Sequence, residues 1–147
     1  MATVNEIPRI HRWLKTILAA DATLVSAAPG GIWRGFVPKG KTGTAVVFDP
    51  MAPLDDTPGN AGYRVWSRWR YVVKAVSDGT SNNDSTLQTA ADRIEAVLEA
   101  VKGGAADIGI DYCIRKRPFY MVEQPTDSDV TYIHLGGEFE IAAHYAG

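Results

Sequence analysis

The feature that most constrains the fold is a two-residue alternation over residues 63–76. Apolar and aromatic side chains occupy most odd positions, and basic side chains with one tryptophan occupy most even positions. A period of two is typical of a β-strand in a sheet with one buried face. The segment therefore predicts a strand whose second face is basic. The residues on that face are Arg64, Trp66, Arg68, Arg70 and Lys74.

Two apolar stripes at helical spacing predict the main helices. The first stripe covers residues 7–18 and the second covers residues 87–101. His11 lies off the residues of the first stripe, so we expect its side chain to face water. Asp21 precedes a short apolar turn and is expected to cap it, because its carboxylate can accept a bond from a free backbone N–H.

The middle of the chain predicts a short strand and a long loop. Residues 44–49 are rich in β-forming types, and Pro50 is expected to stop the strand that they form. Pro50–Gly62 holds three prolines and two glycines, which predicts a long mobile loop. A loop of this length is unusual in a compact domain and is often functional.

Two alternating segments, residues 108–115 and 130–145, predict the final strands. In the first of them we expect Ile108 and Ile114 on one face and Cys113 on the other. The predicted order is helix, strand, strand, helix, strand, strand. This order indicates an α+β fold, with a mostly antiparallel four-stranded sheet and two main helices packed on one face.

Size and charge narrow the function classes. The chain has 147 residues, which fits a single domain over residues 1–147. Its 15 basic and 17 acidic residues give a net charge of −2, so no overall field attracts it to nucleic acid or to an anionic membrane. The single cysteine, Cys113, excludes an internal disulfide and suits a reducing compartment. We find no secretion leader and no run of roughly 20 apolar residues, and we expect folding in a cytoplasm without membrane contact.

One segment, Gly35–Thr42, matches the phosphate-binding pattern G-x-x-x-x-G-K-T. Such a loop binds phosphate because a helix begins at its lysine and directs backbone N–H groups to the anion. Here Thr44–Phe48 follows, and its composition predicts a strand in place of the helix. We therefore expect a surface loop with a basic tip formed by Lys39 and Lys41. A small nucleotide-binding enzyme that uses this loop is kept as an alternative.

No other pattern predicts catalysis, a metal or a cofactor. His11, His134 and His144 lack the spacing of metal ligands, and Cys113 has no histidine near it in sequence. The pair Asp55–Asp56 could hold a hard cation, but turn chemistry explains it as well. We expect no catalytic residue and no bound cofactor.

The basic strand face has two interpretations. In the first it is a solvated surface balanced by acids of a neighbouring strand, Glu138 and Glu140. In the second, these acids and the five residues of the basic face form a subunit interface or line a channel, since tryptophan and arginine are enriched where proteins meet. The residues expected to make contacts from loops are Lys39, Lys41, Asp55 and Asp56.

Six segments follow one another in a recognisable order: Trp13–Leu18, Asp21–Leu24, Ile32–Gly35 with Pro38, Arg70–Ala75, Thr89–Leu98 and Tyr132–Ile141. Their order and spacing resemble the tail terminator, or tail completion, proteins of long-tailed bacteriophages. The resemblance covers most of the chain and includes no catalytic signature. Pro50–Gly62 is more elaborate than the minimal pattern of the family, which leaves its role open.

The resemblance implies a structural virion protein and no enzymatic activity. Such proteins form a hexameric ring at the head-proximal end of the tail tube, where the ring ends tube polymerisation and docks the head connector. The implied partners are further copies of the chain, the tail tube protein and the connector or stopper protein, with DNA passing through the lumen without sequence readout. We expect assembly in the host cytoplasm, and ordering of Val37–Gly43 and Pro50–Gly62 on assembly. Another connector or tail subunit is the alternative within this class.

Overall fold

The computed structural model describes residues 7–58, 64–78, 84–100, 103–105, 108–126 and 130–145, with side chains at 52–58, 64–67 and a few element ends left undescribed. Within these described residues, three helices and six strands follow one another. They are α1 (Ile7–Ala19), α2 (Ala22–Ala27), β1 (Ile32–Arg34), β2 (Ala45–Pro58), β3 (Arg64–Asp78), α3 (Asp84–Ala100), β4 (Gly103–Ala105), β5 (Ile108–Glu123) and β6 (Tyr132–Tyr145).

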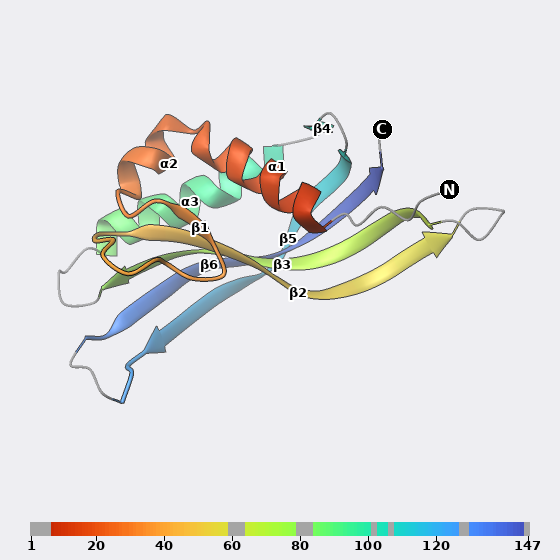
Figure 1. Cartoon of the computed structure of the whole chain (residues 1–147). Coiled ribbons are helices and arrows are strands. Elements are labelled where there is room, and N and C mark those ends of the chain that lie inside the picture. The colour runs from red at the N-terminus through yellow and green to blue at the C-terminus, as the bar shows by residue number, and fades with distance from the viewer. Residues whose placement is uncertain are drawn as a thin grey trace.

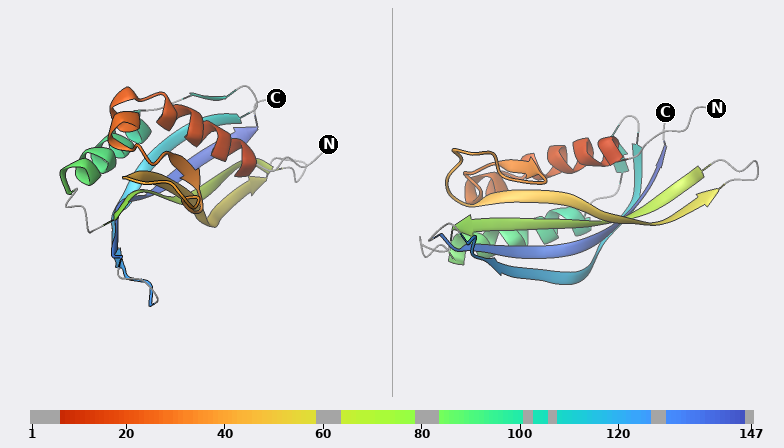
Figure 2. Two further views of the ribbon diagram at one scale, coloured as in Figure 1. Left: turned by 60° about the vertical axis from the view of Figure 1, so that its left-hand side comes forward. Right: turned by 60° about the horizontal axis from the view of Figure 1, so that its bottom comes forward.

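The strands form one twisted sheet in the order β1-β2-β3-β6-β5-β4, and the helices lie on one face of it (Figures 1 and 2). Among the strands that the structure describes, β1 and β2 pair in parallel and the other four pairs are antiparallel. The predicted α+β class and mostly antiparallel sheet are confirmed. The predicted four-stranded sheet and six-element order are wrong, because β1, β4 and α2 also form. Each of the two extra strands has three residues, which is too short for an alternation to reveal.

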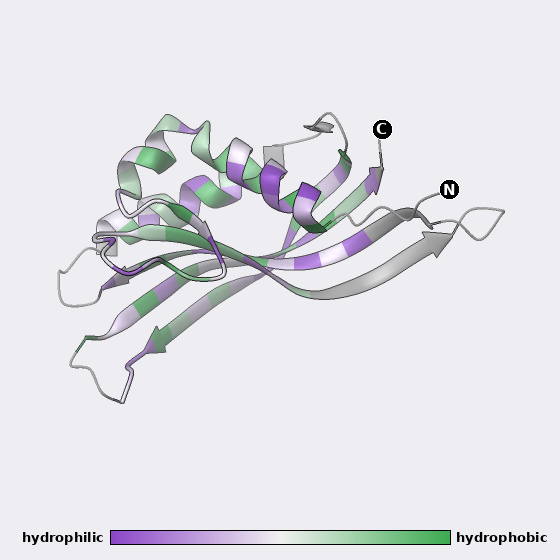
Figure 3. Ribbon diagram, in the orientation of Figure 1, coloured by the Kyte–Doolittle hydropathy of each residue, from purple (hydrophilic) through white to green (hydrophobic). Residues whose placement is uncertain are grey.

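A single core lies between the helices and the sheet. The helices contribute residues at helical spacing and the strands contribute every second residue, so Figure 3 shows the helices striped by hydropathy. Fully buried examples are Leu14 and Leu18 of α1, Ile94 and Leu98 of α3, and Tyr71 of β3.

His11 is buried in this core, contrary to the prediction that it faces water. Its ring centroid lies 5.7 Å from that of Phe48 and 5.6 Å from that of Tyr71. The physical reason is its spacing, because His11 follows Ile7 by four residues and precedes Leu14 by three. It therefore shares their helix face, and burial lowers its pKa.

The predicted Pro50–Gly62 loop is strand up to Pro58, since β2 pairs with β3 along its whole length. Residues 59–62 lie outside the described residues. The ladder contains register shifts between Pro50 and Ala52, between Pro53 and Asp55, and between Thr57 and Pro58. Prolines are tolerated here because β1 pairs only with the start of β2, which leaves the rest of β2 as an edge strand among the described residues.

A β-bulge in β5 reverses the predicted faces of Cys113 and Ile114. Ile110 lies opposite Ala143 of β6 and Tyr112 lies opposite the adjacent residue, so Asp111 is the extra residue. The bulge turns Cys113 into the core, where burial raises the pKa of its thiol to about 12. Ile114 consequently lies on the outer face with 45% of its surface exposed.

The predicted cap at Asp21 is confirmed. Its Oδ1 accepts a hydrogen bond of 2.8 Å from the backbone N–H of Leu24 at the start of α2. The same carboxylate accepts bonds from Arg93 of α3, with a separation of 3.2 Å between Arg93 Nε and Oδ1. The bonds from Arg93 and Leu24 lower the pKa of Asp21. One carboxylate therefore holds two helices together.

Candidate functional site

The first candidate surface is the sheet face away from the helices, here named the charged face. It carries Arg68, Arg70 and Lys74 of β3 and Glu138 and Glu140 of β6. These side chains meet because β3 and β6 are antiparallel neighbours, and opposite residues share a face. Arg70 lies opposite Glu140, and the alternation of both strands places the other three on the same side.

The two acids of the charged face are buried beneath basic and aromatic side chains. Glu138 is 5% exposed and accepts two bonds from Arg117 of β5, of which the one from Nη2 to Oε1 measures 3.1 Å. Nη1 of Arg70 lies 3.9 Å from Oε1 of Glu138. Glu140 accepts a 2.6 Å bond from the Tyr112 hydroxyl, whose pKa is raised by burial and by this bond, while a bond from Arg68 lowers it. Cations and acids of the charged face therefore compensate one another.

For four other predicted site residues, Arg64, Trp66, Asp55 and Asp56, the structure describes the backbone but not the side chain. Trp66 lies opposite His144 of β6 in the β-ladder, and Arg64 lies opposite Pro58. Asp55 and Asp56 belong to β2 and do not lie in a loop, which corrects the prediction for them. The side chains of all four lie outside the described set, so their contacts stay predictions.

The loop between β1 and β2, Gly35–Gly43, follows the β1 edge of the sheet and reaches the end of the charged face that carries Lys74. Together with Lys74 and His134 it lines a cavity of about 540 Å³. Lys39 is exposed at the loop, and Nζ of Lys41 lies 5.5 Å from the ring centroid of Trp33.

No helix begins at Lys41, because the loop continues directly into β2. The sequence prediction on this point is confirmed. The N–H cradle that a phosphate-binding loop requires is therefore missing from Gly35–Thr42.

His134 lies on the outer face of β6 and is buried there. Its Nε2 lies 3.3 Å from Oε2 of Glu123. Burial and the charge of Lys74 lower its pKa, although the Glu123 carboxylate acts in the opposite direction.

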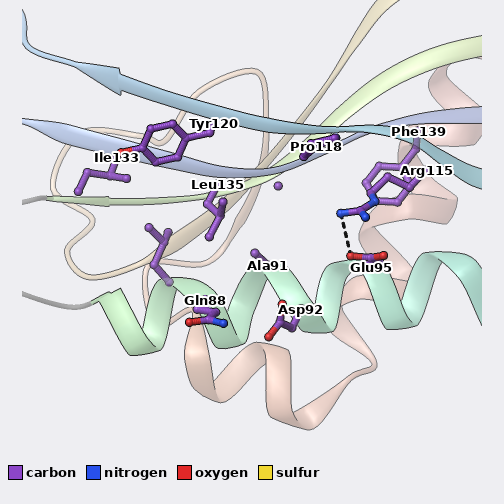
Figure 4. Close-up of a pocket in the computed structure, with 12 residues that line it drawn as sticks. Gln88, Ala91, Asp92, Glu95, Arg115, Pro118, Tyr120, Ile133, Leu135 and Phe139 are labelled. Carbon is purple, nitrogen blue, oxygen red and sulfur yellow. Dashed lines mark ion pairs between the residues drawn. The ribbon is translucent and has the colours of Figure 1, made fainter.

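A second candidate surface lies on the helix side of the sheet, between α3 and the paired ends of β5 and β6 (Figure 4). This cavity of about 500 Å³ is here named the α3 groove. Its apolar lining includes Leu87 of α3, Tyr120 of β5, and Ile133 and Leu135 of β6. Sequence reasoning missed the groove because its walls come from three separate elements. The signal that could have indicated it is the apolar character of β5 after the bulge.

Among the described residues, no three His, Cys, Asp or Glu side chains are grouped so that they could hold a metal ion. None of the described helices combines the length and apolar composition needed to cross a bilayer.

Comparison with known proteins yields a structural similarity only. No family model matches the chain, and no curated protein matches it. A solved chain described as part of the virion of a native gene transfer agent (GTA) particle superposes with a TM-score of 0.61. The two are 17% identical, and the match covers 92% of this chain and 96% of that one. A second solved chain is 16% identical over 94% of this chain and 91% of its own, and its TM-score of 0.48 is too low to carry an argument. The first similarity shows a shared fold.

Proposed function

We propose that this chain is a structural virion protein that forms a ring at the head-proximal end of a phage-type tail tube. The ring ends tube polymerisation and provides the docking surface for the head connector. The observation that carries the proposal is the shared fold with a chain of a GTA virion, which extends over nearly the whole length of both chains. A fold alone does not fix a function, so the sheet edges and surfaces must support the same role.

The open edge of β5 supports an assembling subunit. β4 pairs only with Ile108–Ile110, so residues 111–123 have no outer strand partner in the described part of the chain. Ile114, Tyr120 and Val122 of this stretch are exposed apolar residues. Free strand edges and exposed apolar side chains are both features that a neighbouring subunit can complete.

The proposed partners are further copies of the chain in a hexamer, the tail tube protein and the head–tail connector or stopper. DNA passes through the lumen without sequence readout, in line with the compensated charges of the charged face. The proposed place is the head-proximal end of the tail, after assembly in the host cytoplasm. Arg64, Trp66, Arg68, Arg70, Lys74, Glu138 and Glu140 are proposed to line the lumen or a subunit boundary.

Negative-stain microscopy of particles that lack the protein tests the proposal. We expect overlong tubes without heads, which wild-type protein added back should correct. Particles with tubes of normal length that still join heads would contradict the proposal. Tubes of normal length without heads would instead favour another connector subunit.

A second arm tests the charged face in the same particles. Because Arg70 lies 3.9 Å from Glu138, the neutral change Arg68→Gln with Arg70→Gln disturbs the fold less than reversal to Glu would. We expect the variant to fold, as judged by circular dichroism, and to fail to rescue the tubes. Full rescue would show that these arginines do not contribute to the interface.

Titration with a magnesium nucleotide tests the enzymatic alternative. We expect no binding, and binding would favour that alternative.

A further inference from the structure

The α3 groove has the chemistry to receive an apolar side chain followed by a cation. Its floor is apolar, and Tyr120 at its rim is 67% exposed. Two acids of α3, Asp92 and Glu95, line the helix side (Figure 4). Glu95 is already paired with Nη1 of Arg115 at 3.0 Å, whereas Asp92 is exposed and forms no ion pair with any described residue.

The chain itself carries a segment of complementary chemistry, the loop Gly35–Lys41. Phe36 exposes 75% of its surface, and Lys39 is exposed three residues later. Gly35 and Gly40 have φ values of 78° and 92°, a conformation that other residues rarely adopt. The backbone at these two glycines therefore shapes the tip of the loop. Lys39 forms no ion pair with any described residue.

The loop and the groove lie on opposite faces of the same end of the sheet. The loop lines a cavity with Tyr132 and His134, whereas Ile133 and Leu135 line the groove. Successive residues of a strand point to opposite faces, so the sheet separates the loop of one chain from the groove of that chain. A contact between them must therefore join two copies.

We propose that the Gly35–Lys41 loop of one copy occupies the α3 groove of the next. Phe36 packs against Tyr120 and the apolar floor, and Lys39 lies near Asp92. The contact joins two different surfaces, so it repeats head to tail and closes into a ring when the rotation permits. This inference rests on the proposed ring and identifies the surfaces through which its subunits meet.

Cysteine cross-linking in isolated tails tests the contact directly. A chain with Phe36→Cys and Tyr120→Cys, treated with a short bis-maleimide, is expected to give a ladder of cross-linked oligomers that ends at the ring size. The native thiol of Cys113 should not react, because it is buried and its pKa is raised to about 12. The control chain replaces Phe36→Cys by Val25→Cys, an exposed position on α2.

We expect the Phe36/Tyr120 pair to cross-link at least about tenfold faster than the control, since the proposed contact places the two positions together. Equal rates would overturn the inference. The inference would also be overturned if Tyr120→Cys cross-linked to the tube protein and no product contained Phe36→Cys.

A charge exchange provides an independent test in purified protein. Lys39→Glu is expected to weaken self-association by about two- to fivefold, as for an exposed ion pair, and adding Asp92→Lys should restore it. Phe36→Ala should weaken self-association by about 10- to 100-fold, from the loss of a buried aromatic side chain. Glu99→Lys, an exposed acid on the same helix outside the groove, is the matched control and should not restore it.

If Asp92→Lys and Glu99→Lys both restored the self-association of Lys39→Glu, or if neither did, the inference would be overturned. The proposed function fails separately, because it depends on the length and joining of tubes without the protein. Overlong tubes with no Phe36–Tyr120 product would leave the proposed function standing and remove only this contact.

Discussion

Glu138→Gln tests whether the buried acid of the charged face stabilises the fold by compensating the cations around it. The substitution keeps the size of the side chain and removes its negative charge. Glu138 is 5% exposed and Arg70, 3.9 Å away, is 25% exposed, so both carry part of their charge out of bulk water. The variant leaves the guanidinium of Arg70 next to that of Arg117 without the carboxylate between them.

The magnitude follows from two limits. Two unit charges 4 Å apart interact by roughly 4 kcal/mol at an effective dielectric constant of about 20. Breaking a buried pair costs about 3–5 kcal/mol, whereas an exposed pair contributes about 0–1 kcal/mol. Because Arg70 is partly exposed and can turn towards water, we expect Glu138→Gln to lower the free energy of unfolding by about 1–3 kcal/mol. Arg117 is largely exposed, so its pairing with Glu138 adds nothing to this expected loss of stability.

Urea unfolding at pH 7, followed by tryptophan fluorescence, measures this change as a shift in midpoint at constant slope. The matched control Glu99→Gln removes an exposed acid of α3 and should stay within about 0.5 kcal/mol of wild type. In a double-mutant cycle with Arg70→Gln, the double variant should lose less stability than the sum of the two single losses. A loss below about 0.5 kcal/mol for Glu138→Gln, or a gain in stability, would refute the compensation argument.

Three further predictions concern stability. Asp21→Ala should cost about 1 kcal/mol in chemical denaturation through loss of the α2 cap, and an unchanged midpoint would contradict the role of this cap. Burial lowers the pKa of His11 and His134 below 6.5, so the unfolded chain binds more protons and the free energy of unfolding should fall as the pH drops through 6.5. Urea midpoints at pH 7.5 and 5.5 measure this, and the double change to Gln should flatten the dependence. Gly136→Ala should cost roughly 2–4 kcal/mol in thermal unfolding, because its Cβ would lie 2.3 Å from the carbonyl oxygen of Val73, and a variant as stable as wild type would refute it.

The elements that local periodicity determines could be predicted from the sequence. The two-residue alternation of β3 is confirmed from residue 68 onward, where buried and part-buried residues follow one another in turn. The apolar stripe of α3 is confirmed by Leu87, Ala90, Ile94 and Leu98, all buried. Such patterns survive folding because each face of a helix or strand keeps one environment.

The features that depend on neighbouring strands could not be predicted. Whether Pro50–Pro58 is loop or strand depends on its edge position, and only the pairing with β3 reveals that position. The face of Cys113 depends on the bulge at Asp111, which leaves no signal in the alternation. The two candidate surfaces differ in the same way. The alternation of their strands predicts the outward faces of Glu138 and Arg70, whereas the α3 groove joins residues remote in sequence and could not be predicted.

The prolines of β2 also bear on how free subunits behave at high concentration. Beyond Phe48 the outer edge of β2 has no strand partner among the described residues, and three prolines remove N–H groups from its backbone. A second chain laid along this edge could not form an uninterrupted ladder, which disfavours stacking into fibrils. A protein made in excess before its binding partner is available would for this reason not stack through the β2 edge.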